Sequence, residues 1–449
     1  MKVTIAGASG FIGKRLIEKL PTNIHIKALS RNSAKNLNKN DNLEFYQTDL
    51  FSLQSTTEAL KNTDIAIYLV HSMLPSSRLF QGDFHDTDLI LADNFATACL
   101  KNNVKQIIYL GGLVPDGKIS QHLESRREVE EVFRDTKLPT TILRAGMIVG
   151  DGGSSFEILR NLVNSLPLML LPSWTKSKTQ AVYIDDLIAV LSYAIANQKF
   201  FDKTINVVNG ESITYKDLIY QACARFNKSK PLIPTPINAT GFSKRWVSLF
   251  GKTSYELVSP LIDSLVCDLP QLSCPEEISH LIQYRSFKQM LQKISNTTPA
   301  STKTKVFHGN TVRSIQRFQI NDSISVKTTA NLYLEWLPVF LKRIMKVVQE
   351  DNKIYFRIAF ISKPLLILEY IPAEADVNRV KFHVTGGLLN GAQNAGWLEF
   401  RKIESLQIIL SSINDFTPSL PWFIYIYTQA PFHRFVMNKF GAYMKEQKF

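Results

Sequence analysis

The first 150 residues alternate short apolar runs with amphipathic stretches. Runs rich in β-branched residues predict six strands, at 3–7, 24–30, 43–50, 63–72, 104–112 and 139–150. Apolar positions recur at helical spacing between them, at 11–20, 52–62, 91–103 and 124–136. Short apolar strands that alternate with helices indicate a parallel sheet covered on both faces. The pattern therefore predicts an α/β fold built on a doubly wound parallel sheet.

The rest of the chain leaves this alternation. Residues 155–180 and about 210–295 should form a substrate lobe beside the carboxyl edge of the sheet, completing a first domain over 1–295. The polar stretch NTTPASTKTK at 296–305 has no periodicity and predicts a linker. Residues 306–449 contain mainly strands of five to eight residues, with one helical piece early and a helix at the end. We expect a smaller α+β domain there, an antiparallel sheet gripped by its final helix.

A glycine-rich turn falls between the first strand and the first helix, in the sequence GASGFIG at 7–13. Gly7 permits a tight turn, Gly10 lets the backbone approach a pyrophosphate, and Gly13 allows close packing of helix and strand. Together with Ser9, Phe11 and Ile12, these glycines place the free N–H groups of a helix N-terminus around the phosphates. The motif predicts a nicotinamide dinucleotide as cofactor.

The end of the second strand carries Ser30 and Arg31. An NAD-selective site usually has an acidic residue here for the ribose 2′-hydroxyl, whereas a guanidinium suits a 2′-phosphate. The sequence therefore predicts NADP(H) over NAD(H). The alternative is that Arg31 is a solvated surface residue.

The amino-acid composition limits the classes of partner that are expected. Hydrophobic residues make up 45% and charged residues 20% of 449 residues, as in globular proteins. The net charge of +13 favours anionic partners, but the lysines are dispersed, so nucleic acid is not predicted as a partner. The four cysteines form neither a zinc motif nor a disulfide framework, and no metal site is predicted.

The chain starts directly on a strand and has no apolar stretch of spanning length. We expect a cytoplasmic protein. FSKRWVSLFGK at 242–252 could lie on anionic lipid, although such a short piece is more often a packed surface helix, and PWFIYIYTQAPF at 421–432 could meet a membrane surface or a partner.

Several motifs together resemble a known superfamily. They are GASGFIG, Asp49-Leu50, YLVHSM at 68–73, LRAGMIVG at 143–150, AVYIDDL at 181–187 and INVVNGESITYKDLI at 205–219. Over about 1–290 the chain resembles the short-chain dehydrogenase/reductases, in the extended and atypical branch that includes NmrA-like proteins. The resemblance implies that Asp49 and Leu50 border the adenine. It also implies that Leu69, Val70 and His71 line the nucleotide groove, and that Arg144, Ala145 and Gly146 lie near the nicotinamide.

The C-terminal part resembles helix-grip domains of the START and polyketide-cyclase kind, which enclose apolar ligands. It is also similar to the C-terminal extension of some bacterial atypical reductases. This resemblance implies an apolar small molecule as a further ligand. The oligomeric state is not indicated by the sequence.

The catalytic positions of the family are altered here. The family has Ser or Thr at the end of the fifth strand and a Tyr-x-x-x-Lys pair on the next helix. Here Gly111 and Gly112 stand near the serine position, and His122-x-x-x-Arg126 occupies the Tyr/Lys place on one helical face. His122 is a candidate general acid whose pKa Arg126 should lower, although Arg126 itself stays charged. The alternative is that Arg126 pairs with Glu130 and His122 is a surface residue.

Three functions fit these observations. The first is an NADP(H)-dependent oxidoreductase acting on an apolar carbonyl, quinone or lipid-like compound, since the cofactor carries the chemistry even without the usual triad. The second is a non-catalytic NADP(H) sensor or assembly factor of NmrA-like type. The third is a lipid- or quinone-binding protein whose nucleotide fold is a scaffold. The intact glycine motif and Arg31 disfavour the third, and the sequence favours the oxidoreductase.

Overall fold

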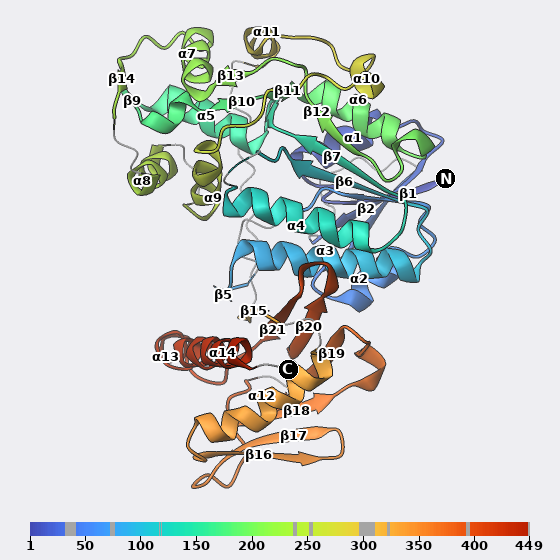
Figure 1. Ribbon diagram of the computed structural model, residues 1–449, viewed down its shortest axis with the longest axis vertical. Helices are drawn as coiled ribbons and strands as arrows, with labels where there is room; N and C mark the ends of the chain where they lie inside the picture. The colour runs from blue at the N-terminus through green and yellow to red at the C-terminus, as the bar shows by residue number, and fades with distance from the viewer. Residues whose placement is uncertain are drawn as a thin grey trace. The chain divides into compact units, whose positions relative to one another are not determined.

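The computed structural model describes residues 1–31, 42–71, 77–115, 117, 119–236, 240–250, 255–295, 310–320, 324–391 and 396–447 (Figure 1). The chain forms two compact units. Unit 1 comprises Met1–Met73 and Asp88–Lys303, and unit 2 comprises Leu74–Thr87 and Thr304–Phe449. The expected linker at 296–305 lies outside the described residues. Residues 74–87, which the sequence analysis placed in the first domain, belong to unit 2.

The core of unit 1 is a seven-stranded sheet in which every neighbouring pair is parallel. Its strands, in spatial order, are β12 (Thr204–Val207), β7 (Thr140–Ala145), β6 (Gln106–Gly112), β4 (Ile65–Tyr68), β1 (Lys2–Ala6), β2 (His25–Ser30) and β3 (Leu43–Gln47). The strand order reverses between β1 and β4, which is where open α/β sheets bind ligands. The predicted α/β fold with a Rossmann-type parallel sheet is confirmed.

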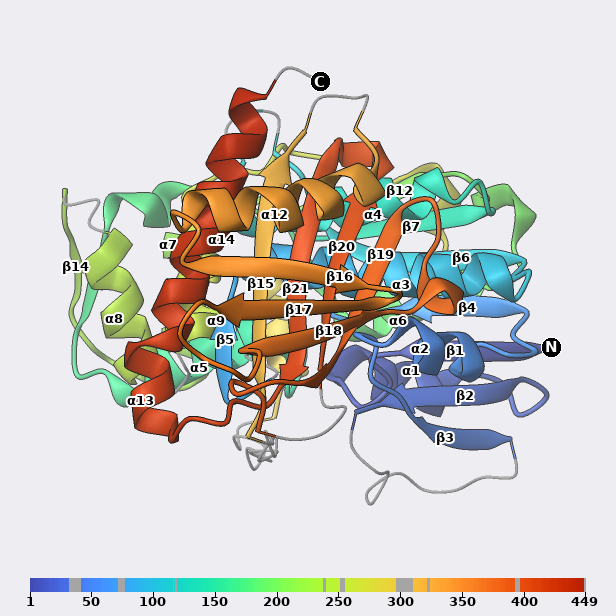
Figure 2. The ribbon, with the colours of Figure 1, turned by 90° about the horizontal axis from the view of Figure 1, so that it is seen from below.

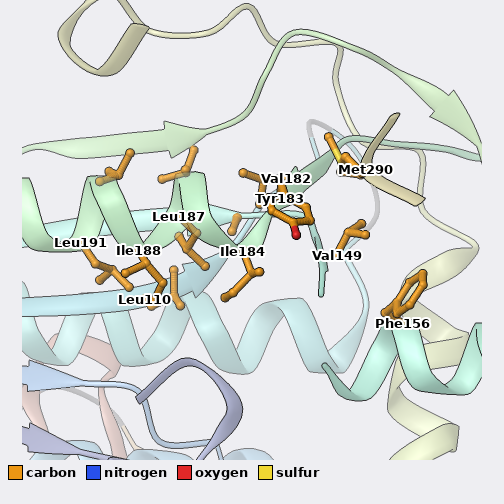
Figure 3. Packing of buried hydrophobic residues seen from close by; sticks show 14 of the residues in the cluster. Leu110, Val149, Phe156, Val182, Tyr183, Ile184, Leu187, Ile188, Leu191 and Met290 are labelled. Atoms are coloured by element: carbon orange, nitrogen blue, oxygen red, sulfur yellow. The ribbon is translucent and has the colours of Figure 1, made fainter. Parts of the chain in front are cut away.

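Helices flank this sheet because its central strands are largely apolar and buried. They are α1 (Phe11–Lys19), α2 (Leu53–Ala59), α3 (Phe84–Lys101), α4 (Gln121–Asp135) and α6 (Ile184–Ala194). In Figure 3, Leu187, Ile188 and Leu191 of α6 gather with Leu110 of β6 in the buried cluster of unit 1. Parallel strands buried on both faces need this helical cover, and the helices hold the carboxyl ends of the strands at one edge.

The predicted sixth strand at 139–150 is broken in the structure. After β7 the chain continues as β8 (Met147–Val149), which leaves the large sheet and pairs with β11 (Ala181–Tyr183). The break falls at Gly146, where a Cβ atom would overlap the carbonyl of Gln180. The close approach of these two backbones therefore requires glycine.

The part of unit 1 in which a substrate lobe was predicted is helical with short two-stranded ladders. Its elements are α5 (Ser154–Ser165), β9 (Met169–Leu171), η1 (Ser173–Lys176), β10 (Lys178–Thr179), η2 (Gln198–Phe200), β13 (Ile213–Thr214), α7 (Tyr215–Arg225), β14 (Leu232–Pro234), α8 (Thr240–Phe250), α9 (Tyr255–Leu265), α10 (Glu276–Ser279) and α11 (Phe287–Gln292). FSKRWVSLFGK, a candidate for membrane contact, lies largely in α8, where Val247 is buried beside Val258 and Ile262 of α9. Helix α9 also packs against α4, which brings the lobe to the helix that follows β6.

Unit 2 contains an eight-stranded mixed sheet. In spatial order its strands are β16 (Met345–Glu350), β17 (Lys353–Ile358), β18 (Leu366–Tyr370), β19 (Arg379–Gly386), β20 (Trp397–Ile403), β21 (Ile408–Phe416), β15 (Val312–Gln319) and β5 (Leu79–Gln81). The pairs are antiparallel except for β15 and β5. An antiparallel sheet was expected here, but β16 lies in the stretch that was expected to be helical, and the parallel edge strand β5 was not expected.

Helices α12 (Val326–Phe340) and α14 (Gln429–Glu446) cross the sheet of unit 2 (Figure 2), and α13 (Trp422–Tyr427) precedes α14. Short turns η3 (Pro372–Glu374) and η4 (Glu404–Leu406) connect strands. Phe318, Leu334, Phe400 and Phe440 belong to the buried cluster between these helices and the sheet. The relation to helix-grip families remains a prediction. Among the described residues, no helix has the length and apolar character needed to cross a bilayer.

Candidate functional site

The glycine turn of unit 1 has the geometry of a phosphate cradle. Gly7 adopts a φ of +85°, and a Cβ there would lie 2.9 Å from the Leu69 carbonyl oxygen. A Cβ on Gly13 would lie 2.5 Å from the Gly7 carbonyl oxygen, so this glycine lets α1 pack onto the turn. Gly10 caps α1 without any side-chain hydrogen bond, and the first-turn N–H groups that follow have no acceptor within the helix. These residues fit a dinucleotide pyrophosphate.

The other predicted cofactor residues on the first four strands collect at the same edge. Ser30 ends β2 and the exposed Arg31 follows it, with the Arg31 carbonyl accepting a bond from Gln47 Nε2 at 3.2 Å. Asp49 and Leu50 come shortly after β3, where the Asp49 carboxylate accepts the N–H of Phe51 at 3.1 Å. Leu69, Val70 and His71 follow β4 directly. The structure therefore brings these residues to the carboxyl edge that holds the glycine turn, and their contacts with a nucleotide remain predictions.

A partly buried chain of hydrogen bonds starts beside that edge. Asp88 Oδ2 lies 2.6 Å from His71 Nδ1, and His71 Nε2 lies 3.1 Å from His122 Nε2. His122 Nδ1 in turn lies 2.9 Å from Ser264 Oγ. Four separate segments supply these groups: α3, the end of β4, α4 and α9. Only 3% of the Asp88 side chain and 11% of the His71 side chain are exposed.

The hydrogen-bond partners fix where the protons lie. The Asp88 carboxylate can only accept, so His71 donates from Nδ1 and, when neutral, has a bare Nε2. Two bare nitrogens would repel at 3.1 Å, so His122 Nε2 carries the proton between the two rings. His122 Nδ1 is then left to accept, and the single proton of Ser264 Oγ can go either to this nitrogen at 2.9 Å or to the Pro260 carbonyl at 3.0 Å. Ser264 Oγ also lies 2.9 Å from Ser120 Oγ. The two imidazoles are thus aligned for proton transfer across their Nε2 atoms.

Burial and a nearby cation keep these imidazoles neutral. Burial lowers the pKa of His122 well below its usual range, and the His71 ring and Arg126 lower it further. Burial also lowers the pKa of His71, with Arg126 acting in the same direction and Asp88 opposing it. The lower pKa of His122 beside Arg126 was expected from the sequence.

Arg126 does not pair with Glu130. Its Nη1 donates at 3.5 Å to the Leu110 carbonyl and lies 3.5 Å from the Tyr109 hydroxyl. Burial raises the pKa of Tyr109 to about 12, although Arg126 opposes this shift. Glu130, fully buried, instead accepts two bonds from Arg144, at 2.9 Å from Nε and 2.6 Å from Nη2. The alternative of an Arg126–Glu130 ion pair is therefore wrong, because Glu130 is bonded to Arg144 of strand β7.

The serine position of the family is occupied by other side chains. A Cβ on Gly111 would lie 2.9 Å from Glu130 Oε1 and 3.1 Å from Tyr109 Cε1. A Cβ on Gly112 would lie 3.3 Å from Leu123 Cδ2. A serine at position 111 would thus collide with the carboxylate that binds Arg144. Ala145 is buried and Gly146 holds the backbone crossing described above.

Two residues of this hydrogen-bond chain were not predicted from the sequence. Asp88 follows His71 by 17 residues, without a motif that links them. Ser264 comes from α9, 142 residues after His122. Only the folded chain places them together, since neither spacing corresponds to a shared helical or strand face.

Comparison with known proteins agrees with the predicted nucleotide-binding part of this site. Residues 7–164 match a family model described as NAD(P)H-binding. That match comprises the glycine turn, His71, Asp88 and His122. Nicotinamide dinucleotide binding by unit 1 is thereby supported.

Two curated relatives match parts of the chain. The auxiliary protein GraX of Staphylococcus aureus is 30% identical over 122 residues, 27% of this chain and 40% of that protein. The N-acetyl-α-D-glucosaminyl-diphospho-ditrans,octacis-undecaprenol 4-epimerase of Escherichia coli O157:H7 is 25% identical over 271 residues, 53% of this chain and 77% of that protein. The chain thus spans less than half the length of the first relative.

Solved structures show the same fold. A nucleoside-diphosphate-sugar epimerase from Staphylococcus aureus is similar over 65% of this chain and 100% of its own, with 17% identity and a TM-score of 0.53. The triphenylmethane reductase of Citrobacter, complexed with NADP(H), is similar over 65% and 99%, with 17% identity and a TM-score of 0.51. At this identity the likeness establishes the Rossmann-type architecture alone.

Proposed function

We propose that the chain is an NADP(H)-dependent oxidoreductase acting at a carbonyl or hydroxyl carbon of an apolar, lipid-like compound. The observation that carries this proposal is the Asp88–His71–His122–Ser264 chain beside the nucleotide edge. A tyrosine with a lysine at that position would exchange a proton with the substrate oxygen. The imidazole pair can perform the same exchange, because each neutral ring has one nitrogen that accepts a proton and one that donates it.

The order of the bonds gives a proton path. In the oxidising direction, a substrate hydroxyl proton enters at His122 Nδ1, directly or through the Ser264 hydroxyl. His122 Nε2 passes its own proton to His71 Nε2 across 3.1 Å. The His71 imidazolium that results faces the Asp88 carboxylate at 2.6 Å, which stabilises the charge. The nicotinamide supplies the hydride acceptor for this direction and the donor for the reverse.

NADP(H) is the preferred nucleotide in this proposal. Arg31 is exposed at the end of β2, and no acidic residue follows β2 directly. An exposed guanidinium can reach a 2′-phosphate, whereas a carboxylate would repel it. The Citrobacter reductase of similar fold was solved with NADP(H), which is consistent with this choice.

The relative named as an undecaprenol-linked sugar 4-epimerase supports a lipid-like substrate. The test is NADPH oxidation with a panel of apolar aldehydes, ketones, quinones and polyprenyl-linked sugars, using the full chain and His122→Ala. Turnover by the wild type and at least a 100-fold loss in His122→Ala are expected, since general acid–base catalysis contributes roughly 10²–10⁴-fold. Equal turnover by the variant removes His122 from the mechanism.

A second candidate function is a non-catalytic NADP(H) sensor. The relative named as an auxiliary protein, 30% identical over 122 residues, favours it. Tight NADPH binding without turnover on any compound of the panel would select this function over the first.

A further inference from the structure

Helices α13 and α14 of unit 2 leave large aromatic side chains in solvent. Phe423 is 67% exposed, Tyr427 80%, and Phe432 and Phe435 each 50%. The other side of α14 is buried in the core through Val436, Met437, Phe440 and Met444. The aromatic side of these helices therefore contributes little to the core.

The same surface continues beyond α14. The Phe435 ring lies 6.0 Å from the ring of Phe340, at the end of α12. Just past α12, the Ile344 carbonyl accepts the N–H of Ala359 at 3.4 Å, which brings the β17–β18 loop alongside. Exposure in this region reaches 69% for Val339, 58% for Ile344 and 93% for Phe360. We call these exposed side chains the aromatic surface: Val339, Ile344, Phe360, Phe423, Tyr427, Phe432 and Phe435.

The segments that carry the aromatic surface are mainly cationic, and the exposed Glu335 lies one turn before Val339 in α12. Residues 336–349, 352–368 and 416–445 lack aspartate and glutamate altogether. Exposed cations are distributed through them, namely Lys342, Arg343, Lys363, Arg434 and Lys439. Lys439 Nζ lies 5.8 Å from the centre of the Phe435 ring, so charge and aromatic groups are interleaved. A predominantly cationic surface favours a partner of the opposite charge.

Aromatic rings surrounded by lysine and arginine match the chemistry of a bilayer interface. Aromatic side chains favour the headgroup level, and basic residues bind anionic headgroups there. A protein partner of comparable size would need acidic groups arranged to meet five separate cations, whereas an anionic bilayer presents phosphates everywhere. We propose that the aromatic surface binds an anionic phospholipid bilayer, with its rings in the headgroup layer and its cations on the lipid phosphates. This inference needs no nucleotide and stands independently of the proposed function.

Vesicle co-sedimentation of the full chain, without nucleotide, tests the proposal. Vesicles of equal parts phosphatidylglycerol and phosphatidylcholine should pellet the protein at low salt, and pure phosphatidylcholine vesicles should pellet much less. The double variant Phe360→Ser/Tyr427→Ser should lower the partition coefficient at least about tenfold, because both side chains are largely exposed and act mainly on the membrane. Lys342→Glu/Arg343→Glu should abolish the preference for anionic vesicles.

Val377→Ser is the matched control, since Val377 is 87% exposed in unit 2. It precedes β19 and lies at the end of the sheet where Asn352 meets Tyr370, away from the β17–β18 loop. It should pellet like the wild type. The proposal is overturned if the wild type ignores anionic vesicles or if both double variants pellet normally. It is also overturned if the variants change only the oligomeric state in size-exclusion chromatography, because the surface is then an interface between copies.

Discussion

His71 Nε2 and His122 Nε2 face each other at 3.1 Å, with room for one proton between them. The two rings lie 5.0 Å apart at their centres and are tilted by 47°. Because Asp88 fixes the tautomer of His71, the direction of the bond between the two imidazoles follows from one buried carboxylate. The two histidines therefore act as one unit, and changes at either end should affect both.

Replacing Asp88 by asparagine should slow catalysis without abolishing substrate binding. The variant keeps the shape of the side chain but removes the charge that stabilises the His71 imidazolium. We expect kcat to fall by about 10²–10⁴-fold with KM changed little, and the pH–rate profile to shift. Ser125→Ala is the control, because Ser125 Oγ donates to Asp88 Oδ2 at 3.2 Å and its loss leaves the charge in place. A Ser125→Ala variant as slow as Asp88→Asn would assign the effect to packing.

The histidine pair should make the protein less stable in mild acid. Burial lowers the pKa of His122 and of His71, so below about pH 6.5 the unfolded chain binds protons that the folded chain refuses. The free energy of unfolding should then fall with decreasing pH by about 1.4 kcal/mol per pH unit for each such proton. When denaturant unfolding is measured from pH 7.5 to 5, the free energy of unfolding of His122→Asn should fall less steeply with decreasing pH than that of the wild type. The exposed His25→Asn variant should leave the slope unchanged.

Restoring the family's serine at position 111 should destabilise the protein. The new Cβ would meet Glu130 Oε1 at 2.9 Å and the Tyr109 ring at 3.1 Å. We expect Gly111→Ser to lower the free energy of unfolding by about 1–3 kcal/mol, as for other overpacked sites. Gly112→Ser should cost less, since its nearest neighbour is Leu123 Cδ2 at 3.3 Å, the end of a flexible side chain. Thermal unfolding of the two variants compares them directly.

Arg31→Ala should weaken NADPH binding and leave NADH binding nearly unchanged. Hydrogen bonds to a charged group contribute about 1.5–3 kcal/mol, so roughly a 10- to 100-fold rise in Kd for NADPH is expected. Nicotinamide fluorescence titration measures both nucleotides. Lys19→Ala is the control, because Lys19 is an exposed cation at the opposite end of α1 from the glycine turn. Wild-type affinity for NADH equal to that for NADPH would contradict the preference for NADP(H).

The spacing of apolar residues predicted the strands and helices of the sheet in unit 1, because this spacing is a property of each strand or helix by itself. They failed for β5, whose residues Leu79–Gln81 are too few to show alternation. This strand exists because it pairs with Val312–Ser314, far along the chain. Its placement was therefore beyond any reading of neighbouring residues.

The candidate site likewise has residues that were predicted from the sequence and residues that were not. The His122 and Arg126 spacing marked one helical face, and the glycine turn marked the nucleotide edge. The helical four-residue rule failed for Arg126 and Glu130, because Arg144 on β7 makes a buried two-bond contact with that carboxylate. Asp88 and Ser264 were missed because tertiary packing alone brings them to the imidazoles.

The position of residues 74–87 in unit 2 has a practical consequence for dissecting the protein. A fragment ending at residue 303 would retain Leu79–Gln81 without the strand they pair with. The complementary fragment would lose its edge strand and also leave Arg317 without Asp86, to which its Nε donates at 2.7 Å. Neither piece is a self-sufficient module. Ligand studies of either half should therefore use the intact polypeptide, or both fragments expressed together so that the strand can be restored.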